Sequence, residues 1–284
     1  MTESLGDRMK LYESAEAGRR LMPLLPAIAR LDGRPFHSFV RGLAKPFDKR
    51  LSDLMIDTAI FLVRETNAVI GYTQSDEITL AWVPEEFDSQ IFFDGRVQKM
   101  TSMLAALCAV HFNRRLPAFL PPEYAERLPV FDCRVWNVPT LEEAVNAFLW
   151  RELDTTKNSI SMAARAYYDH ADIHDKNGSE MQELLWRKGV NWNEYPAFFK
   201  RGTYIRRCIV KRAFTAAELD ALPPKHAARS NPGLIVERTE CVPLEMPPLA
   251  KVENRVGVLF REEEPRLAAN NSPAPDLPGA DELR

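Results

Sequence analysis

A chain of 284 residues, 45% of them hydrophobic, is long enough to bury a sizeable core in one large domain or two small ones. Its formal charge of −3 excludes the overall basic character of many nucleic-acid-binding domains, so any contact with RNA must use local basic patches. The 4 cysteines lack the spacing of a zinc site or a disulfide framework. The N-terminus is charged and no stretch of about 18 apolar residues follows, so we expect a cytoplasmic protein.

The first part of the chain predicts strands and helices in alternation. Residues 24–39 predict a strand that ends at Asp32, then a turn and a helix. Apolar or small residues at helical spacing over 48–65 predict an amphipathic helix that packs on a sheet. Alternating apolar residues over 68–83 predict a hairpin with the two carboxylates of 75–77 at its tip.

A helix over about 96–115 and a proline-bounded strand over 128–139 complete the order βαββαβ. This order predicts an α+β protein with a ferredoxin-like fold. The palm domains of polymerases and nucleotidyl cyclases share that fold, so the fold alone does not select a reaction. We expect residues 1–139 to form a catalytic palm domain.

The remainder of the chain predicts helical and β additions to the palm. Thr140, with Glu143 three residues later, predicts a capping box that opens a long helix. A second helix, a turn at Gly189 and a basic strand are expected over 181–204. The proline-rich sequence beyond these elements predicts two further strands, at 234–238 and 255–260. We expect an extension over 140–261 that packs on the palm, and a disordered tail over 262–284.

Two carboxylates are expected to meet at one end of the predicted sheet. Asp32 and Asp76 would repel each other there unless a cation lay between them. Mg²⁺ characteristically binds one or two carboxylates together with substrate phosphates, so the pair suggests a two-metal site for phosphoryl transfer. Gly33 has no side chain and lets its carbonyl approach a metal or phosphate closely. On spacing alone, however, two solvated turns are the favoured interpretation.

Six segments change this balance because they occur together in one order. They are RLDGRPFHSF, KPFD, GYTQSDEITL, FDCR, WRELD and KRGT. In this combination the sequence resembles the tRNA(His) guanylyltransferase superfamily over roughly residues 25–210. The resemblance implies a polymerase-like palm that binds two Mg²⁺ ions through Asp32, the backbone carbonyl of Gly33, and Asp76.

The resemblance implies further site residues. Ser75 would position the activated RNA end, and Lys45 would act near the activating nucleotide, where Phe47 replaces a polar residue of the family motif. Arg96 and Lys99, on one face of a helix, would neutralise a triphosphate. The implied nucleotide-binding set is Arg30, Gly33, Arg34, Pro35, Phe36, His37, Asp48, Arg96, Lys99 and Asn158. For His37, a structural histidine in the core is the alternative.

A group of six cations follows the predicted second helix of the extension. It comprises Lys200, Arg201, Arg206, Arg207, Lys211 and Arg212. Such a cluster would suffice for several phosphate contacts despite the acidic overall balance. The alternative is an ordinary strand with a solvated face.

The implied reaction adds nucleotides to the 5′ end of tRNA. ATP adenylylates the 5′-monophosphate, and the 3′-hydroxyl of GTP or another nucleoside triphosphate then attacks the activated phosphate. Both displacements use metal ions and need no nucleophilic side chain. The segment 156–159, TKNS, resembles the bacterial and archaeal branch, which favours template-directed repair of 5′-truncated tRNA over guanosine addition to tRNA(His). The family's assembly implies a homotetramer, a dimer of dimers.

Two other functions are compatible with carboxylates at this place in the fold. A nucleotidyl cyclase or a conventional palm polymerase would use similar carboxylates in a similar fold, but neither explains WRELD or KRGT. A catalytically silent tRNA-binding protein would be expected to lack Asp32 or Asp76, and both are present.

Overall fold

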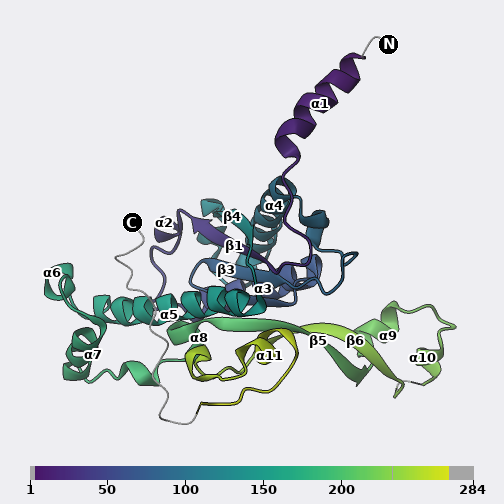
Figure 1. Cartoon of the computed structure of the whole chain (residues 1–284). Coiled ribbons are helices and arrows are strands. Elements are labelled where there is room, and N and C mark those ends of the chain that lie inside the picture. Colours follow the sequence, from purple (N-terminus) through teal and green to yellow (C-terminus); the bar gives the residue numbers. More distant parts are fainter. Residues whose placement is uncertain (1–3, 232, 269–284) are drawn as a thin grey trace.

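The computed structural model describes residues 4–231 and 233–268 (Figure 1). A six-stranded sheet of order β4-β1-β3-β2-β5-β6 forms its centre, and all neighbouring strands are antiparallel. The strands are β1 (Ala27–Arg34), β2 (Ile70–Gln74), β3 (Glu77–Trp82), β4 (Val130–Asn137), β5 (Thr203–Ala213) and β6 (Ile235–Leu244). The protein is therefore of the α+β class, as predicted.

Four helices supply most of the helical residues. They are α1 (Leu5–Ala17), α3 (Lys49–Thr66), α4 (Val97–Arg115) and α5 (Leu141–Arg165). The shorter helices are α2 (Phe36–Phe39), α6 (His170–Ile173), α7 (Gly178–Arg187), α8 (Ala197–Arg201), α9 (Ala216–Ala221), α10 (Ala227–Ser230) and α11 (Arg255–Phe260). No helix of the described residues is both long and apolar enough to span a membrane.

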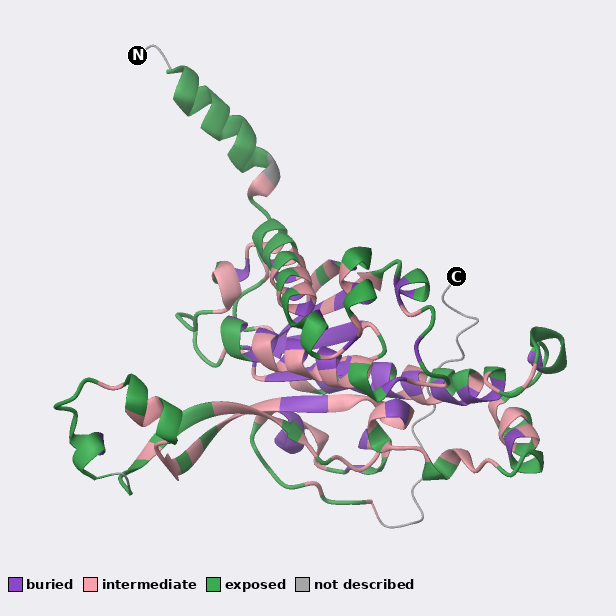
Figure 2. Ribbon diagram, turned by 180° about the vertical axis from the view of Figure 1, so that it is seen from behind, coloured by how far each residue is buried: buried purple, intermediate pink, exposed green. Residues whose placement is uncertain are grey.

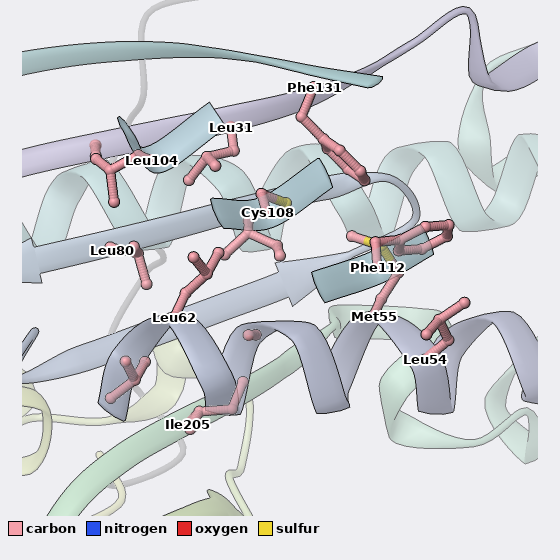
Figure 3. Close-up of a cluster of buried hydrophobic side chains, with 14 of the residues drawn as sticks. Leu31, Leu54, Met55, Leu62, Leu80, Leu104, Cys108, Phe112, Phe131 and Ile205 are labelled. Carbon is pink, nitrogen blue, oxygen red and sulfur yellow. The ribbon is translucent and has the colours of Figure 1, made fainter. Parts of the chain in front are cut away.

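Helices cover both faces of the sheet. On one face, α3 and α4 enclose the main core, where Leu31, Leu80 and Phe112 lie together (Figure 3). On the other face, α5 and α11 cover a second apolar cluster that includes Ile28. Because successive side chains of a strand point to opposite faces, even-numbered residues of β1 face α5. This alternation places Asp32 on the α5 face of the sheet.

The helix predicted over 48–65 is confirmed as α3. Its first turn is capped by the Asp48 side chain, which accepts a hydrogen bond from the Arg50 backbone N–H, and it ends at Asn67 in the left-handed conformation. The expected apolar stripe is the buried one. The hairpin predicted over 68–83 is confirmed as β2–β3. The helix predicted over 96–115 is confirmed as α4, and the strand predicted over 128–139 is confirmed as β4.

Several predicted boundaries differ from the structure. The first strand continues through Asp32 to Arg34, because this segment pairs with β4 up to Val130. The cap of α5 is half of a capping box, since Thr140 accepts from the Glu143 N–H while the Glu143 carboxylate accepts from Asn146 instead.

The strand expected at 255–260 is wrong, because these residues form helix α11. Its Val258 and Leu259 are buried against α5, and a short apolar run that is buried does not distinguish strand from helix by periodicity. The expected basic strand begins only at Thr203, because the residues before it form α8. The turn at Gly189 is confirmed, with a φ of +75°.

Two parts of the chain extend away from the central sheet. Helix α1 projects from the body, and its residues 5–15 are exposed (Figure 2). Strands β5 and β6 form a long arm that carries α9 and α10 at its far end (Figure 1). Strand β5 joins the sheet through its first residues only, Thr203–Arg206, which pair with β2. Of the expected tail, residues 269–284 lie outside the described residues, and Leu267 forms an isolated bridge with Val252.

Candidate active site

A row of carboxylates crosses the α5 face of the sheet. Asp32 on β1 pairs in register with Glu77 on β3 and with Asp132 on β4. Directly opposed residues of antiparallel strands share a face, so these three carboxylates lie side by side. Sequence reasoning placed Asp32 here but missed Asp132, although FDCR was among the motifs that carried the resemblance.

Asp76 lies at the turn between β2 and β3, next to this row. Its backbone carbonyl accepts a hydrogen bond of 3.1 Å from the Gly33 N–H, which ties the turn to β1. Ser75 adopts a positive φ of 47° and donates from Oγ to Asp76 Oδ1 at 2.9 Å. Burial raises the pKa of the Asp76 carboxyl, and the nearby charge of Asp32 raises it further.

This electrostatic environment is suited to a cation. A positive ion between Asp32 and Asp76 would relieve both the desolvation and the repulsion that disfavour two carboxylate charges. No group of three or more His, Cys, Asp or Glu side chains in the described residues is arranged to hold a metal. Mg²⁺ characteristically binds one or two carboxylates and takes its other ligands from water and substrate phosphates, which fits this pair.

Gly33 is required by packing as well as by its place in the site. A Cβ at this position would lie 2.1 Å from the ring of Phe36. That ring is buried against Phe39, Phe112 and Phe131 and has no room to move aside. Phe36, expected among the nucleotide-binding residues, is thus a core residue that holds the β1–α2 connection in place.

A cavity of about 310 Å³ opens beside the β2–β3 turn. It brings together four of the expected site residues, which are Lys45, Asp48, Ser75 and Asn158. The remaining lining combines polar side chains from α5 with an apolar group that includes Phe47, Phe198 and Phe199. A lining of this kind, polar in part and aromatic in part, is typical of nucleotide and cofactor sites.

The loop that carries Lys45 is shaped by Asp48. The Asp48 carboxylate accepts hydrogen bonds from the Ala44 N–H at 3.2 Å, the Arg50 N–H at 3.0 Å and the Arg50 guanidinium at 2.7 and 3.0 Å. The Arg50 hydrogen bonds are the main reason that the pKa of Asp48 falls to about 2. Its side chain is only 4% exposed, so Asp48 organises the cavity wall.

The surroundings of Phe47 account for the apolar residue at this position of the family motif. Its ring packs on the rings of Tyr195, Phe198 and Phe199, with centroids 6.0, 5.2 and 4.7 Å away. A polar side chain at this position would be placed among aromatic rings. The substitution therefore gives the cavity an apolar wall.

A chain of polar contacts along α5 links the carboxylate row to the cavity. Arg151 donates to Glu77 Oε1 at 2.7 Å and to Asp154 Oδ2 at 3.1 Å. Asn158 donates to the same Asp154 oxygen at 3.1 Å. Sequence reasoning missed Arg151 and Asp154, although their spacing from Asn158 puts all three on one helix face. It also placed Glu77 at the hairpin tip without a partner, whereas Glu77 is buried in the pair with Arg151.

Arg30 faces the same row from β1. Its Nε lies 4.0 Å from Glu77 Oε2, and its guanidinium carbon lies 5.3 Å from the ring centroid of Trp150. Arg34, Pro35 and His37 are exposed beside the site, and Arg34 pairs with Asp132 at 2.6 Å. The alternative interpretation of His37 as a core histidine is wrong.

The structure does not bring Arg96 and Lys99 to this site within one chain. Helix α4 begins beside the segment that leads into β1, where the Val97 N–H donates to the Arg19 carbonyl. The carboxylates lie at the other end of that strand, about 16 Å away for five residue steps. The expected contact of Arg96 and Lys99 with a triphosphate therefore stays a prediction, since α4 begins at the end of β1 opposite Asp32.

The six cations expected to contact phosphates do not form one cluster. Arg212 pairs with Glu218 and Glu240, and Lys211 lies 3.2 Å from Glu237 on the neighbouring strand. Lys200 donates from Nζ to the backbone carbonyl of Asn193. The alternative interpretation, a strand whose cations are solvated or paired, describes β5 better.

Comparison with known proteins gives consistent matches. A family model described as tRNAHis guanylyltransferase (Thg1) matches residues 6–139. A bacterial tRNA(His) guanylyltransferase (Thg1)-like protein in complex with ATP is 36% identical, with a TM-score of 0.66, over 72% of this chain and 88% of that chain. A corresponding GTP complex is 31% identical, with a TM-score of 0.67, over 89% and 98%.

The curated relatives agree with the solved structures. The tRNA(His) guanylyltransferase of Neurospora crassa is 27% identical over 228 residues, which are 73% of this chain and 74% of that protein. The carboxylate row, the adjoining cavity and these similarities all indicate the same enzyme class. The chain belongs to the tRNA(His) guanylyltransferase (Thg1) superfamily and is a nucleotidyltransferase of tRNA processing.

Proposed function

We propose that this protein adds nucleotides to the 5′ end of tRNA in the 3′-to-5′ direction, after ATP-dependent activation of that end. The observation that carries the proposal is the placement of the Asp32–Asp76 carboxylate pair beside a partly aromatic cavity. The carboxylate pair suits metal-assisted transfer of a phosphate, and the cavity suits a nucleoside. The solved relatives in complex with ATP and with GTP support nucleoside triphosphates as substrates.

In this proposal Asp32, the Gly33 carbonyl and Asp76 hold two Mg²⁺ ions. When bound, the ions activate the attacking hydroxyl and neutralise charge on the phosphates. Ser75 keeps the Asp76 carboxylate in place through its hydrogen bond. Arg151 and Arg30 neutralise Glu77, and Arg34 pairs with Asp132, so that Asp32 and Asp76 are the carboxylates left to face the substrate phosphates.

The cavity is assigned to the nucleotide that activates the 5′ end. Lys45 and Asn158 line it and supply a positive charge and an amide for the phosphates and the sugar. Phe47 and Phe199 supply apolar surface for the base. The expected roles of Arg34, Pro35 and His37 stay predictions, and their exposure beside the site is compatible with contact to RNA.

The finer description of the enzyme follows from the same proposal. The order β4-β1-β3-β2, with α3 and α4 as crossovers, supports a ferredoxin-like palm over residues 1–139, extended by residues 140–261. We propose that it acts in the cytoplasm as a homotetramer. Its role would be repair of 5′-truncated tRNA, in which pairing with the opposite strand selects the incoming nucleotide.

The test uses truncated tRNAs that differ only in the base opposite the missing position. Template-directed repair predicts incorporation of the complementary nucleotide in each case. Addition of guanosine to tRNA(His) alone, whatever the opposing base, would show that the repair role is wrong. Asp32→Ala and Asp76→Ala should each abolish both activation and addition, whereas Asp53→Ala, an exposed carboxylate on α3, should retain both.

A further inference from the structure

Trp150 is a large aromatic residue left half exposed beside the carboxylate row. It lies on α5 next to Leu149, which is 2% exposed, yet its own side chain is 51% exposed. Two guanidinium groups flank its ring, from Arg151 at 4.6 Å and from Arg30 at 5.3 Å to the centroid. Both arginines also face Glu77, the register partner of Asp32. The ring is therefore held in place next to the site.

Two arginines beside Trp150 are incompletely paired with the carboxylates of the row. Arg134 is the register partner of Arg30 on the same face of the sheet, and its side chain is 53% exposed. The Nε of Arg30 is buried without a hydrogen-bond partner, because the Glu77 oxygen lies 4.0 Å away. A guanidinium in this state gains a charge-assisted hydrogen bond when an anionic oxygen arrives and Arg30 turns toward it. The surface thus combines an aromatic ring with two arginines that are able to meet phosphate.

This combination is the one that proteins use for nucleotides at strand ends. Bases stack on aromatic side chains while cations hold the backbone, and both contacts tolerate any base. The activating-nucleotide cavity lies further along the same helix, since Asn158 is about 12 Å beyond Trp150 along the helix axis. The two surfaces are separate, and Arg151 and Asp154 connect them.

We propose that Trp150 is the stacking platform for the 5′-terminal base of the RNA substrate, with Arg30 and Arg134 holding its phosphates. The inference rests on the proposed function and adds the position of the RNA strand. RNA lies on the Trp150 side of α5, and the activating nucleotide lies on the Asn158 side. The 5′ phosphate then lies over the row that contains Asp32. Trp150 is a positioning residue for the RNA end.

The first experiment measures binding without nucleotide. A 5′-phosphorylated truncated tRNA is titrated into the wild type, Trp150→Phe, Trp150→Leu and Trp186→Phe, with tryptophan fluorescence and filter binding as readouts. Trp186 is the matched control, because it is 64% exposed on α7 and away from the row. RNA should quench the wild type and Trp186→Phe, and the quenching should be absent in Trp150→Phe. Trp150→Leu should weaken binding about tenfold, and Trp150→Phe by less.

The second experiment separates stacking from a structural effect of the substitution. A tRNA whose 5′-terminal nucleotide is abasic should bind the wild type about tenfold more weakly, but should bind Trp150→Leu as the intact tRNA does. Additive losses would overturn the proposal. Quenching of Trp150 by free ATP rather than by RNA would overturn it as well, because the ring would then belong to the nucleotide site.

The outcomes also separate this inference from the proposed function. Nucleotide addition by the wild type, without any effect of Trp150 on RNA binding, refutes the platform and leaves the function intact. Quenching and the abasic effect without nucleotide addition support the platform and refute the function. Throughout, the KM for ATP should be the same in Trp150→Phe and in Trp186→Phe.

Discussion

Removal of Arg151 should destabilise the protein far more than removal of a surface arginine. Its side chain is 10% exposed, that of Glu77 is 8% exposed, and their charged atoms are 2.7 Å apart. Taking away one member of a buried ion pair costs about 3–5 kcal/mol, because the other charge stays buried without its partner. Arg30 still faces Glu77 at 4.0 Å, so we expect Arg151→Met to lie near the lower end, at about 3 kcal/mol.

The double variant should recover much of this loss. Replacing Glu77 and Arg151 together with Met removes both buried charges and keeps apolar volume in place. The loss should then shrink to about 1–2 kcal/mol, which reflects the lost contacts of Arg151 with Asp154 and Trp150. The double variant should therefore be more stable than Arg151→Met alone.

Urea unfolding of the wild type, Arg151→Met, Glu77→Met and the double variant measures the coupling free energy between Glu77 and Arg151 directly. Arg187→Met is the control, because the pair of Arg187 with Glu183 is solvent exposed and should contribute at most about 0.5 kcal/mol. If Arg151→Met loses no more stability than Arg187→Met, the pair is not desolvated in solution. A double variant less stable than Arg151→Met would contradict the unpaired-charge explanation.

Three further outcomes are expected. Gly33→Ala should cost about 1–3 kcal/mol in thermal unfolding, because its Cβ would meet the ring of Phe36. The pKa of Asp48 is lowered from 3.8 to about 2, so its stabilisation is full above pH 3.8 and is lost as the pH falls to about 2. Asp48→Ala should lack this part of the acid transition. Lys45→Ala should slow addition to 5′-monophosphate tRNA far more than addition to 5′-triphosphate tRNA, because the triphosphate already carries a leaving group. The control variant Lys49→Ala should slow neither reaction. Equal losses on both substrates would place Lys45 in the shared addition step.

Local patterns in the sequence were sufficient for most of the central sheet. The stripe of α3 and the alternation of β2 and β3 depend on side chains a few residues apart. The α3 stripe is the buried face of that helix, whereas β2 and β3 are buried on both faces. The same logic failed at α11, since a six-residue apolar run fits a buried strand and a buried helix equally well.

The candidate site was predictable in part. The convergence of Asp32 and Asp76 follows from strand order, and the motifs placed Lys45, Ser75 and Asn158 around one cavity. The partners of the charged residues did not follow from the motifs. Asp132 enters the row by register with β1, an interaction over about a hundred residues of sequence that no local spacing encodes.

The sequence by itself thus determined the succession of elements, the family and the carboxylate pair, because each depends on neighbouring residues or on recognisable motifs. Only the tertiary structure decided which charged side chains pair with one another. It buried Glu77 against Arg151, bound Asp48 to its own loop, and placed Arg96 at the far end of the sheet. The physical reason is that an ion pair depends on the distance between two side chains, and register and packing set that distance when the chain folds.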